Sequence, residues 1–393
     1  MNQDNDMKKK QQVIKFIIII ILFWFAQYVY VPYQTPFLTA INVAAGFIGI
    51  VVGAYGFSQM LLRIPLGILA DWHLNHKLLI TLGTLLAGLA SIMRVLFPSG
   101  IGFLLGNIFS GIASSTWLSF MIYFLKLRSD VSKVENMGIL VMANNLGMLL
   151  GFVISSLFYT KIAMKGLCVL GVLAGILACI MTMSLPSFQF SYSSGKNSFI
   201  NLINVFKSKT LLISGALAFI QQGIQMATTM SFTNQVIKEI HTPTYAEGLS
   251  SIIYMCSAVL FARLTSSKYI EKFSDRSILI VSYFLLALYC FAIPLARKIY
   301  LIYLLQIIPG VGTGILFAIL NAAAISNVPQ KSLSTATGVF QSIYALGMTL
   351  FPIFAGQLRT QYSMTVSFQV MGILALLGDC IVIIFWQKVS KNN

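Results

Sequence analysis

The dominant pattern in this chain is a series of long apolar runs that recur along nearly its whole length and carry almost no charge. A helix that crosses the hydrocarbon core of a bilayer needs about 20 mostly apolar residues, and the runs are of this size. Membrane-spanning strands would instead need short alternating segments, so we reject a β-barrel. The pattern predicts helices at residues 14–38, 44–69, 77–97, 101–125, 135–159, 164–185, 210–235, 247–268, 275–296, 299–325, 333–358 and 364–387.

Composition supports an all-α integral membrane protein with twelve transmembrane helices. Of the 393 residues, 58% are hydrophobic and only 9% are charged, which is too little charge for the surface of a soluble domain. The first run resembles a signal peptide, but it is too long and has no Ala-x-Ala cleavage site, so we expect a retained helix. The net charge of +16 does not indicate nucleic-acid binding, because the basic residues lie between the helices.

The loops are short except for residues 186–209, which are rich in Ser and contain Lys196, Lys207 and Lys209. We interpret this stretch as a cytoplasmic linker between an N-terminal half, residues 1–185, and a C-terminal half, residues 210–393. If the N-terminus is inside, the cytoplasmic loops hold clearly more Lys and Arg than the outer loops. The positive-inside rule therefore predicts that both termini are cytoplasmic and that the protein is a multi-pass protein of the cell membrane.

Self-similarity at an offset of about 200 residues relates the two halves. Two motifs and one glycine recur in the same order: Arg63-x3-Gly67-x3-Asp71 and Arg263-x3-Ser267-x3-Glu271, Ser132-x2-Glu135-x2-Gly138 and Ser332-x2-Thr335-x2-Gly338, and Gly147 and Gly347. Asn107 corresponds to Gln306 one residue away from that offset. Matches that keep both order and offset indicate a duplication, and duplicated six-helix halves are a known transporter architecture with the substrate site between them.

The segment from Gly67 to Lys77 resembles the loop signature that follows the second helix in the major facilitator superfamily (MFS), a superfamily of secondary transporters. The resemblance covers essentially the whole chain through the helix count, the linker and the paired motifs, and it assigns no subfamily. It implies two pseudo-symmetric six-helix bundles, and a gating motif at their cytoplasmic ends. The residues of this motif are Arg63, Gly67, Asp71, Lys77, Arg263, Ser267, Glu271, Lys272 and Arg276.

In the family, the two acids of this motif close the inner gate, Asp71 against helix eleven and Glu271 against helix five. Such anions would face the positive N-terminal ends of those helices. The competing interpretation is a charged loop that only determines topology. The sequence also departs from the family: Trp72, Leu74 and Asn75 replace the usual loop residues, and Asn107 replaces the helix-four Arg of many proton-coupled members. Helix five has no Gly-Pro pair, which argues against a typical proton-driven drug pump.

Polar residues within the apolar runs need partners and so suggest a cavity. In the family, helices one, four, seven and ten line this cavity, and here those helices carry amides, hydroxyls and aromatic rings. Such groups can bind a neutral polar solute, although hydrogen bonds between helices would also explain each one separately. The candidate cavity residues are Gln27, Tyr30, Gln34, Asn107, Trp117, Asn144, Gln221, Gln222, Gln225, Gln306, Asn321, Gln341 and Tyr344.

Acidic residues are scarce, and all but one lie at helix ends or in loops, Glu239 and Glu247 among them. Asp379, within the twelfth predicted helix, is the exception and is our candidate for a coupling residue. Arg94, near the outer end of the third helix, is interpreted as a side chain that snorkels to the interface rather than as an anion site.

These features predict a transporter, active or facilitative, that moves a small solute by alternating access, with a sugar-like neutral solute favoured. Export of amphipathic compounds, as in drug or metabolite efflux, is the alternative, and a membrane receptor or sensor on a transporter scaffold is an alternative of a different class. We find no catalytic constellation, cofactor motif or metal-ligand spacing, and therefore expect no enzyme activity, no cofactor and no bound metal. The expected partners are the solute and the lipid bilayer; a proton or other ion gradient is a candidate driving force, and we expect a monomer.

Overall fold

The fold is described from a computed structural model, which covers residues 2–70, 75–129, 133–188, 206, 208–265, 272–326, 328 and 333–390. Within these ranges the chain is almost entirely helical and contains no strand. The helices of the first half are α1 (Asn2–Tyr28), α2 (Val31–Ala40), α3 (Ala45–Ala70), α4 (His76–Leu96), α5 (Gly100–Ser115), α6 (Trp117–Leu127) and α7 (Lys133–Met183).

The second half repeats this order with more interruptions. Its α-helices are α9 (Lys209–Ala227), α10 (Thr233–Glu239), α11 (Tyr245–Thr265), α12 (Asp275–Ala292), α13 (Ile299–Leu305), α14 (Ile307–Val311), α15 (Phe317–Ser326), α16 (Leu333–Gln361) and α17 (Met364–Ser390). Two π-helical turns, η2 (Thr228–Phe232) and η5 (Gly312–Leu316), and a 3-10 turn, η4 (Ile293–Leu295), join them. Such π turns are frequent at functional sites.

The predicted fold class is confirmed, and α7 comprises the predicted fifth and sixth helices, which meet at a kink. Eleven helical spans are long and apolar enough to cross a membrane, and α7 is counted once among them. Within α7, the backbone at Ala163 has φ 52° and ψ −173°, so the helix turns back there and its two arms cross separately. The predicted boundary between residues 159 and 164 falls at this kink.

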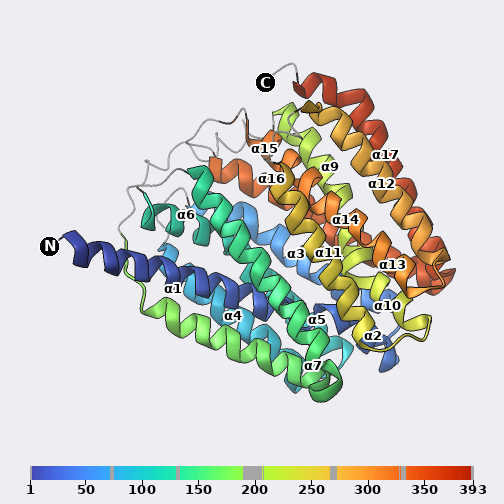
Figure 1. The fold of residues 1–393 in the computed structure, drawn as a ribbon, viewed down its shortest axis with the longest axis horizontal. Coiled ribbons are helices and arrows are strands. Elements are labelled where there is room, and N and C mark those ends of the chain that lie inside the picture. The colour runs from blue at the N-terminus through green and yellow to red at the C-terminus, as the bar shows by residue number, and fades with distance from the viewer. Residues whose placement is uncertain are drawn as a thin grey trace.

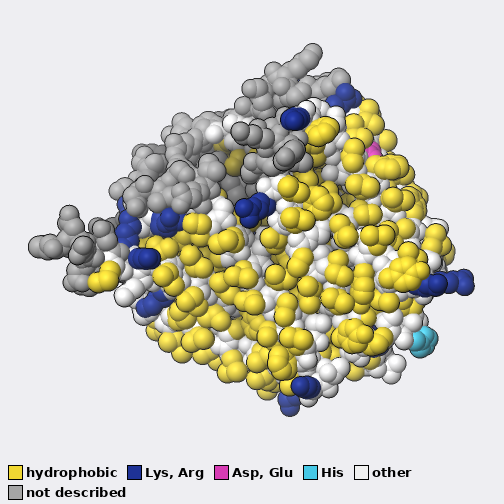
Figure 2. All heavy atoms as spheres, in the orientation of Figure 1, with side chains coloured by type: hydrophobic (Ala, Val, Ile, Leu, Met, Phe, Trp, Pro, Cys, Tyr) yellow, Lys and Arg dark blue, Asp and Glu magenta, His cyan; other side chains and the backbone are white. Residues whose placement is uncertain are grey.

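The helical bundle has two ends, called here the distal end and the termini-bearing end. The distal end carries the turns at residues 41–44, 97–99, 163, 240–244, 296–298 and 362–363, and the termini-bearing end carries the start of α1 and the end of α17 (Figure 1). Apolar side chains cover most of the face seen in Figure 2, with Lys and Arg mainly toward its margins. Leu173, Ile180 and Phe284 are among the exposed apolar residues, as expected for a surface that faces lipid.

The two halves pack most closely where α3 meets α16. A Cβ added to Gly49 would lie 2.2 Å from the carbonyl oxygen of Pro352, and one added to Gly53 would lie 2.5 Å from that of Thr349. In lipid, helices associate by close van der Waals packing, and small residues allow the backbones to approach. These glycines therefore fix how tightly the halves close on this side.

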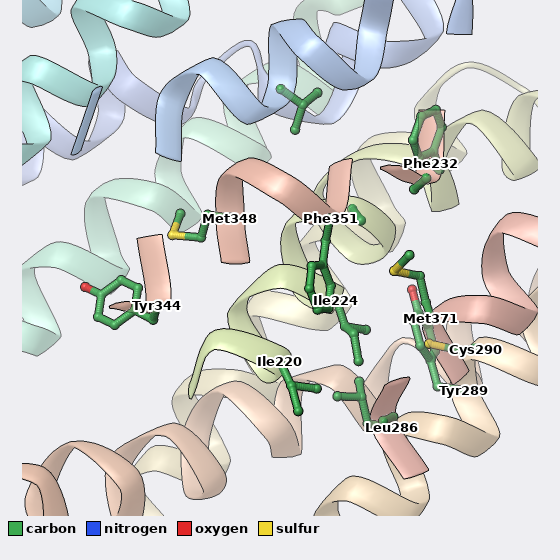
Figure 3. Packing of buried hydrophobic residues seen from close by; sticks show 14 of the residues in the cluster. Ile220, Ile224, Phe232, Leu286, Tyr289, Cys290, Tyr344, Met348, Phe351 and Met371 are labelled. Atoms are coloured by element: carbon green, nitrogen blue, oxygen red, sulfur yellow. The ribbon is translucent and has the colours of Figure 1, made fainter. Parts of the chain in front are cut away.

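The hydrophobic core of the second half packs against α16 from within that half. Figure 3 shows Ile220 and Ile224 of α9 with Leu286 and Tyr289 of α12, together with Phe351 of α16. These residues are buried and anchor α16 to its own half.

We predict that Gly49→Ala lowers the thermal unfolding midpoint, because the new methyl group would overlap the Pro352 carbonyl and force α3 away from α16. Overpacking of this kind costs about 1–3 kcal/mol. Thermal unfolding of the purified protein in detergent measures the effect.

Gly312→Ala is the matched control, since no described atom lies within 4 Å of a Cβ added there. Equal shifts in the two variants would contradict the interpretation of the α3–α16 contact.

Candidate functional site

The first polar site joins three helices of the N-terminal half. The side-chain amide nitrogen of Gln27, in α1, donates to the hydroxyl of Ser114 in α5 at 2.9 Å and to the carbonyl oxygen of Ser110 at 2.9 Å. The hydroxyls of Tyr55, in α3, and Ser114 are also 2.9 Å apart. Gln27, Ser114 and Tyr55 form what we call the N-triad, and all three are buried.

A matching site joins three elements of the C-terminal half. Gln225 of α9 donates to the Tyr254 hydroxyl of α11 at 2.6 Å, and Thr313 of η5 donates to the side-chain oxygen of Gln225 at 3.1 Å. The hydroxyls of Tyr254 and Thr313 are 3.0 Å apart, which closes a cycle of three hydrogen bonds. We call Gln225, Tyr254 and Thr313 the C-triad. Gln221 also donates to Gln225, at 2.9 Å.

The two triads are related by the internal repeat. Gln225 follows Gln27 by 225 − 27 = 198 residues, Tyr254 follows Tyr55 by 254 − 55 = 199, and Thr313 follows Ser114 by 313 − 114 = 199. Each triad thus has an amide from the first helix of its half, a phenol from the second and a hydroxyl from the fourth. The duplication therefore extends from the loop motifs to a pair of matching hydrogen-bond clusters.

Tyr28 of α1 lies between the triads, since it interacts electrostatically with both Tyr55 and Tyr254. An apolar cluster that includes Phe152 of α7 and Met230 of η2 packs around Tyr254 and also touches Tyr28. The two halves therefore meet at the triads through aromatic and methionine side chains.

Arg94 corrects our sequence-based interpretation, because it does not snorkel to the interface. Its side chain is 1% exposed, and one guanidinium nitrogen, Nη2, donates to Tyr30, Asn107 and Ser110 at 2.8, 2.8 and 2.9 Å. The guanidinium carbon lies 3.8 Å from the centroid of the Tyr30 ring. Asn107 also donates to the carbonyl oxygen of Val51 at 2.7 Å. Neutral oxygens and a ring thus stabilise this buried cation.

The distal end is closed by contacts between the halves on three sides. Thr35 of α2 and Ser231 of η2 are hydrogen-bonded at 2.9 Å, and Asn234 of α10 donates to the carbonyl oxygen of Pro32 at 2.8 Å. On the α3–α16 side, the Gly46 amide donates to Thr360 at 2.9 Å.

On the third side, α7 packs against α11. A Cβ added to Gly248 would lie 2.5 Å from the Cβ of Ser156, and the Ser156 hydroxyl donates to the carbonyl oxygen of Tyr245 at 3.3 Å. Gly248 is the repeat counterpart of Gly49, since 248 − 49 = 199. The same glycine position therefore closes the distal end in both halves.

The termini-bearing end is asymmetric. Arg63 of α3 is buried, donates to the hydroxyl of Tyr344 in α16 and lies over its ring, and a Cβ added to Gly338 would lie 2.9 Å from the Arg63 carbonyl oxygen. The repeat counterparts differ: Arg263 is exposed, and no described atom lies within 4 Å of a Cβ at Gly138. Among the described residues, the halves meet at this end where α3 packs against α16 and, through Ile64, against Leu211 of α9.

The other predicted gating residues differ in burial and in their contacts. Gly67 is buried and close to Gly338, Lys77 is half-buried, and Lys272 is exposed. Arg276 donates to the carbonyl oxygen of Ile383 at 2.9 Å, within the second half. Asp71, Ser267 and Glu271 lie outside the described residues.

The predicted cavity residues divide by burial. Gln34, Gln221 and Gln306 are buried, and Gln306 donates to Ser250 of α11 at 2.6 Å. Those with at least partial exposure are Trp117, Asn144, Gln222, Gln225, Asn321 and Gln341. Tyr30 and Asn107 belong to the Arg94 network, and Tyr344 pairs with Arg63, so these three serve contacts within the bundle.

Our sequence-based candidate set missed both phenols of the triads. Tyr55 and Tyr254 stand in apolar runs without a polar neighbour that would draw attention. The available signal was the repeat itself, because the two tyrosines recur at the offset that relates Asn107 to Gln306. Asp379 lies within α17, as predicted, and is 8% exposed.

This architecture defines a class: a multi-pass helical membrane protein with two related six-helix halves, each of which holds a polar cluster. The sequence profile of the Major Facilitator Superfamily matches residues 16–297 and 211–393, so the chain belongs to this family of membrane transporters. Its substrate is accordingly a small molecule.

Individual relatives are distant. An uncharacterised MFS-type transporter of Methanocaldococcus jannaschii is 23% identical over 319 residues, which cover 77% of this chain and 79% of the relative. The crystal structure of the nucleoside transporter NupG covers 95% of this chain and 98% of its own, with a TM-score of 0.77 and 16% identity. A bacterial homologue of the lysosomal transporter Spinster, in an inward-facing unoccupied conformation, has a TM-score of 0.73 at 14% identity and covers 98% of each chain.

We predict that Asn107→Ala lowers the thermal unfolding midpoint, because it removes an acceptor from the buried Arg94 guanidinium and the donor to Val51. Leaving buried polar groups without a partner costs about 1–3 kcal/mol each. Thermal unfolding in detergent measures the shift.

Asn321→Ala is the matched control, because this exposed amide lies in α15, in the other half. An Asn107→Ala midpoint equal to that of the control would contradict a stabilising role for the network.

Proposed function

We propose that this transporter moves a small, neutral, polar solute, with nucleosides and sugars as the candidate classes. The observation that carries the proposal is the pair of matching triads, one in each half, with Tyr28 between them. Amide and hydroxyl groups suit the hydroxyls and ring heteroatoms of such solutes, and aromatic side chains suit their rings.

The absence of a carboxylate from both triads argues against a cationic solute. Neither triad contains a carboxylate, and the buried carboxylates of the described residues, Glu247 and Asp379, belong to neither. Arg63 interacts electrostatically with Tyr55 of the N-triad, and its guanidinium donates to the Tyr344 hydroxyl and lies over the Tyr344 ring. The fold neighbour NupG, a nucleoside transporter, agrees with this class of solute.

Transport would proceed by alternating access, in which the halves rock about the triads. Such rocking would open the distal end, which is closed here, and would close the termini-bearing end, where the halves touch on one side. We further propose that the termini-bearing end is cytoplasmic, that the protein works as a monomer in the cell membrane, and that residues 186–209 link the halves. An ion gradient is a candidate driving force, and Asp379 is one candidate for coupling to it.

The proposal is tested by uptake into liposomes that contain the purified protein, with a panel of radiolabelled nucleosides, sugars, amino acids and amphipathic dyes, with and without a proton gradient. We expect saturable uptake of a nucleoside or a sugar. Movement of dyes alone would favour the export of amphipathic compounds, which the methionines beside Tyr254 could serve. Binding of a solute without movement would favour a receptor.

Gln225→Ala should raise the KM for the transported solute about 2- to 10-fold, because the variant loses the amide of the more exposed triad. One hydrogen bond contributes about 0.5–1.5 kcal/mol, which corresponds to this range. Concentration-dependent uptake in liposomes gives KM and kcat separately.

Gln369→Ala removes an exposed amide of α17 and is the control. If KM is the same for both variants, Gln225 does not bind the solute.

The gating role of Arg63 is also a proposal, and Tyr344→Phe tests it by removing only the hydroxyl that Arg63 contacts. We expect altered kcat with little change in KM, because the variant weakens a contact between the halves rather than a contact with solute. Tyr362→Phe, at an exposed position near the end of α16, is the control. Unchanged kcat for Tyr344→Phe would remove this contact from the gate.

A further inference from the structure

A buried carboxyl group lies where the two halves close the distal end. Glu247, in the first turn of α11, is 4% exposed, and its oxygen Oε2 is buried without a hydrogen-bond partner among the described residues. The next residue, Gly248, packs against Ser156 of α7, in the other half. Our sequence-based placement of Glu247 at a helix end was correct, but it gave no indication of this burial.

The groups that face Glu247 come from both halves. Tyr33 of α2 and Tyr159 of α7 interact with it electrostatically, and their rings are stacked 3.9 Å apart at an angle of 5°. Lys238 of α10 interacts with it as well, and its ammonium group donates to the carbonyl oxygen of Pro36 at 2.9 Å. No salt bridge to Glu247 occurs within the described ranges.

Two further phenols complete this environment. Tyr303 of α13 donates to the carbonyl oxygen of Ala246 at 3.5 Å, and Tyr245, on α11 itself, is exposed. Phenol and ammonium groups ordinarily titrate near pH 10. Glu247 is therefore the group of this set that can change its charge near neutral pH.

Packing alone does not require a carboxyl group at this position. The repeat counterpart of Glu247 is Ile48, since 247 − 48 = 199, and Ile48 is fully buried beside Gly49 on the α3–α16 side. The same junction is thus closed with an apolar side chain in one half and an acid in the other. Such a departure from the repeat at a buried position points to a role beyond packing.

Burial ties the charge of Glu247 to the position of the halves. An ionised carboxylate without a salt-bridge partner is costly away from water, so the neutral acid suits the closed distal end. Separation of α11 from α2 and α7 would admit water and stabilise the ionised form. Because linkage is reciprocal, the proton concentration at that end must then shift the balance between closed and open forms.

We propose that Glu247 is a proton-binding site that takes up a proton as the distal end closes and releases it as that end opens. Acidic pH at the distal side therefore favours the closed form, and alkaline pH favours the open form. This inference rests on the proposed rocking of the halves but is independent of the solute class.

Asp379, our sequence-based candidate for coupling, has a different setting. It interacts electrostatically with Tyr283 of α12 in its own half, and α17 packs against α12. Rocking of the halves would leave this contact intact, so its burial would not follow the state of the distal end.

The test is a distance measurement by pulsed electron paramagnetic resonance on the full chain in lipid nanodiscs. Spin labels at Lys165→Cys and Arg297→Cys, both exposed at the distal end and in different halves, are introduced after replacement of the five native cysteines. Between about pH 5 and pH 9, we expect a longer distance to gain population as pH rises. Glu247→Gln should keep the shorter distance at every pH, and Glu247→Asp should keep a pH response.

Two variants serve as controls for other titrating groups. His241→Asn tests the exposed histidine of the α10–α11 turn, and Asn tolerates the positive φ of 56° found there. Asp379→Asn tests the rival carboxyl group. Both variants should show the same pH dependence of the spin-label distance as the parent protein. Loss of this dependence in either variant would assign the pH response to that residue and overturn the proposal.

The proposal would also be overturned if the spin-label distance in Glu247→Gln changed with pH as in the parent. The same holds if the parent showed one distance at every pH. If Glu247→Gln does not fold, the Glu247→Asp variant decides. A pH midpoint of the distance change equal to that of the parent would then overturn the proposal. No substrate is present in this experiment. Failure of the uptake assay would therefore remove the solute class and leave the switch, and failure here would leave the transport assay intact.

Discussion

The hydrocarbon core of a membrane offers no hydrogen bonds, so each polar side chain in this bundle must find its partner within the protein. This constraint explains why the interior polar groups occur in sets. Gln27 donates to Ser114, and Gln225 donates to Tyr254. Asn107 accepts from Arg94 and donates to the carbonyl oxygen of Val51. Each set joins helices that are distant in sequence. The groups suited to contact a polar solute therefore also position the helices of each half.

The duplication supplies this arrangement twice, and the differences between the copies are informative. The N-triad is fully buried, while Gln225 and Thr313 of the C-triad are partly exposed. The C-triad also includes a residue of the π turn η5, where the helix is locally widened, whereas Ser114 lies in the regular helix α5. A solute that enters between the halves would therefore meet the C-triad first. The N-triad is linked through Ser110 to the Arg94 network.

The sequence was sufficient to predict the all-helical membrane fold and the positions of most helices, because hydrophobic length and repeat offset are local or periodic properties. It was not sufficient for the side-chain partners. Arg94 near a helix end suggested snorkelling, but its burial depends on Tyr30, in the turn before α2, and on Ser110 of α5. Tyr55 and Tyr254 gave no local signal. The kink at Ala163, which lies between two predicted helices, has a positive φ, and no Gly or Asn at that position indicated it.

Glu247 shows how one substitution within a repeat can give a symmetric scaffold a direction. Gly49 and Gly248 close equivalent junctions at the distal end, and both junctions need little more than small residues and apolar packing. Placing an acid beside one of them adds a cost to closure that depends on protonation and leaves the other junction unaffected. Closure of the α7–α11 side then responds to pH, while closure of the α3–α16 side does not. At the opposite end, Arg63 contacts Tyr344 on the α3–α16 side, so each end has its charged group at a different junction. Such an arrangement lets the two ends respond to different conditions, as a transporter requires if they are not to open together.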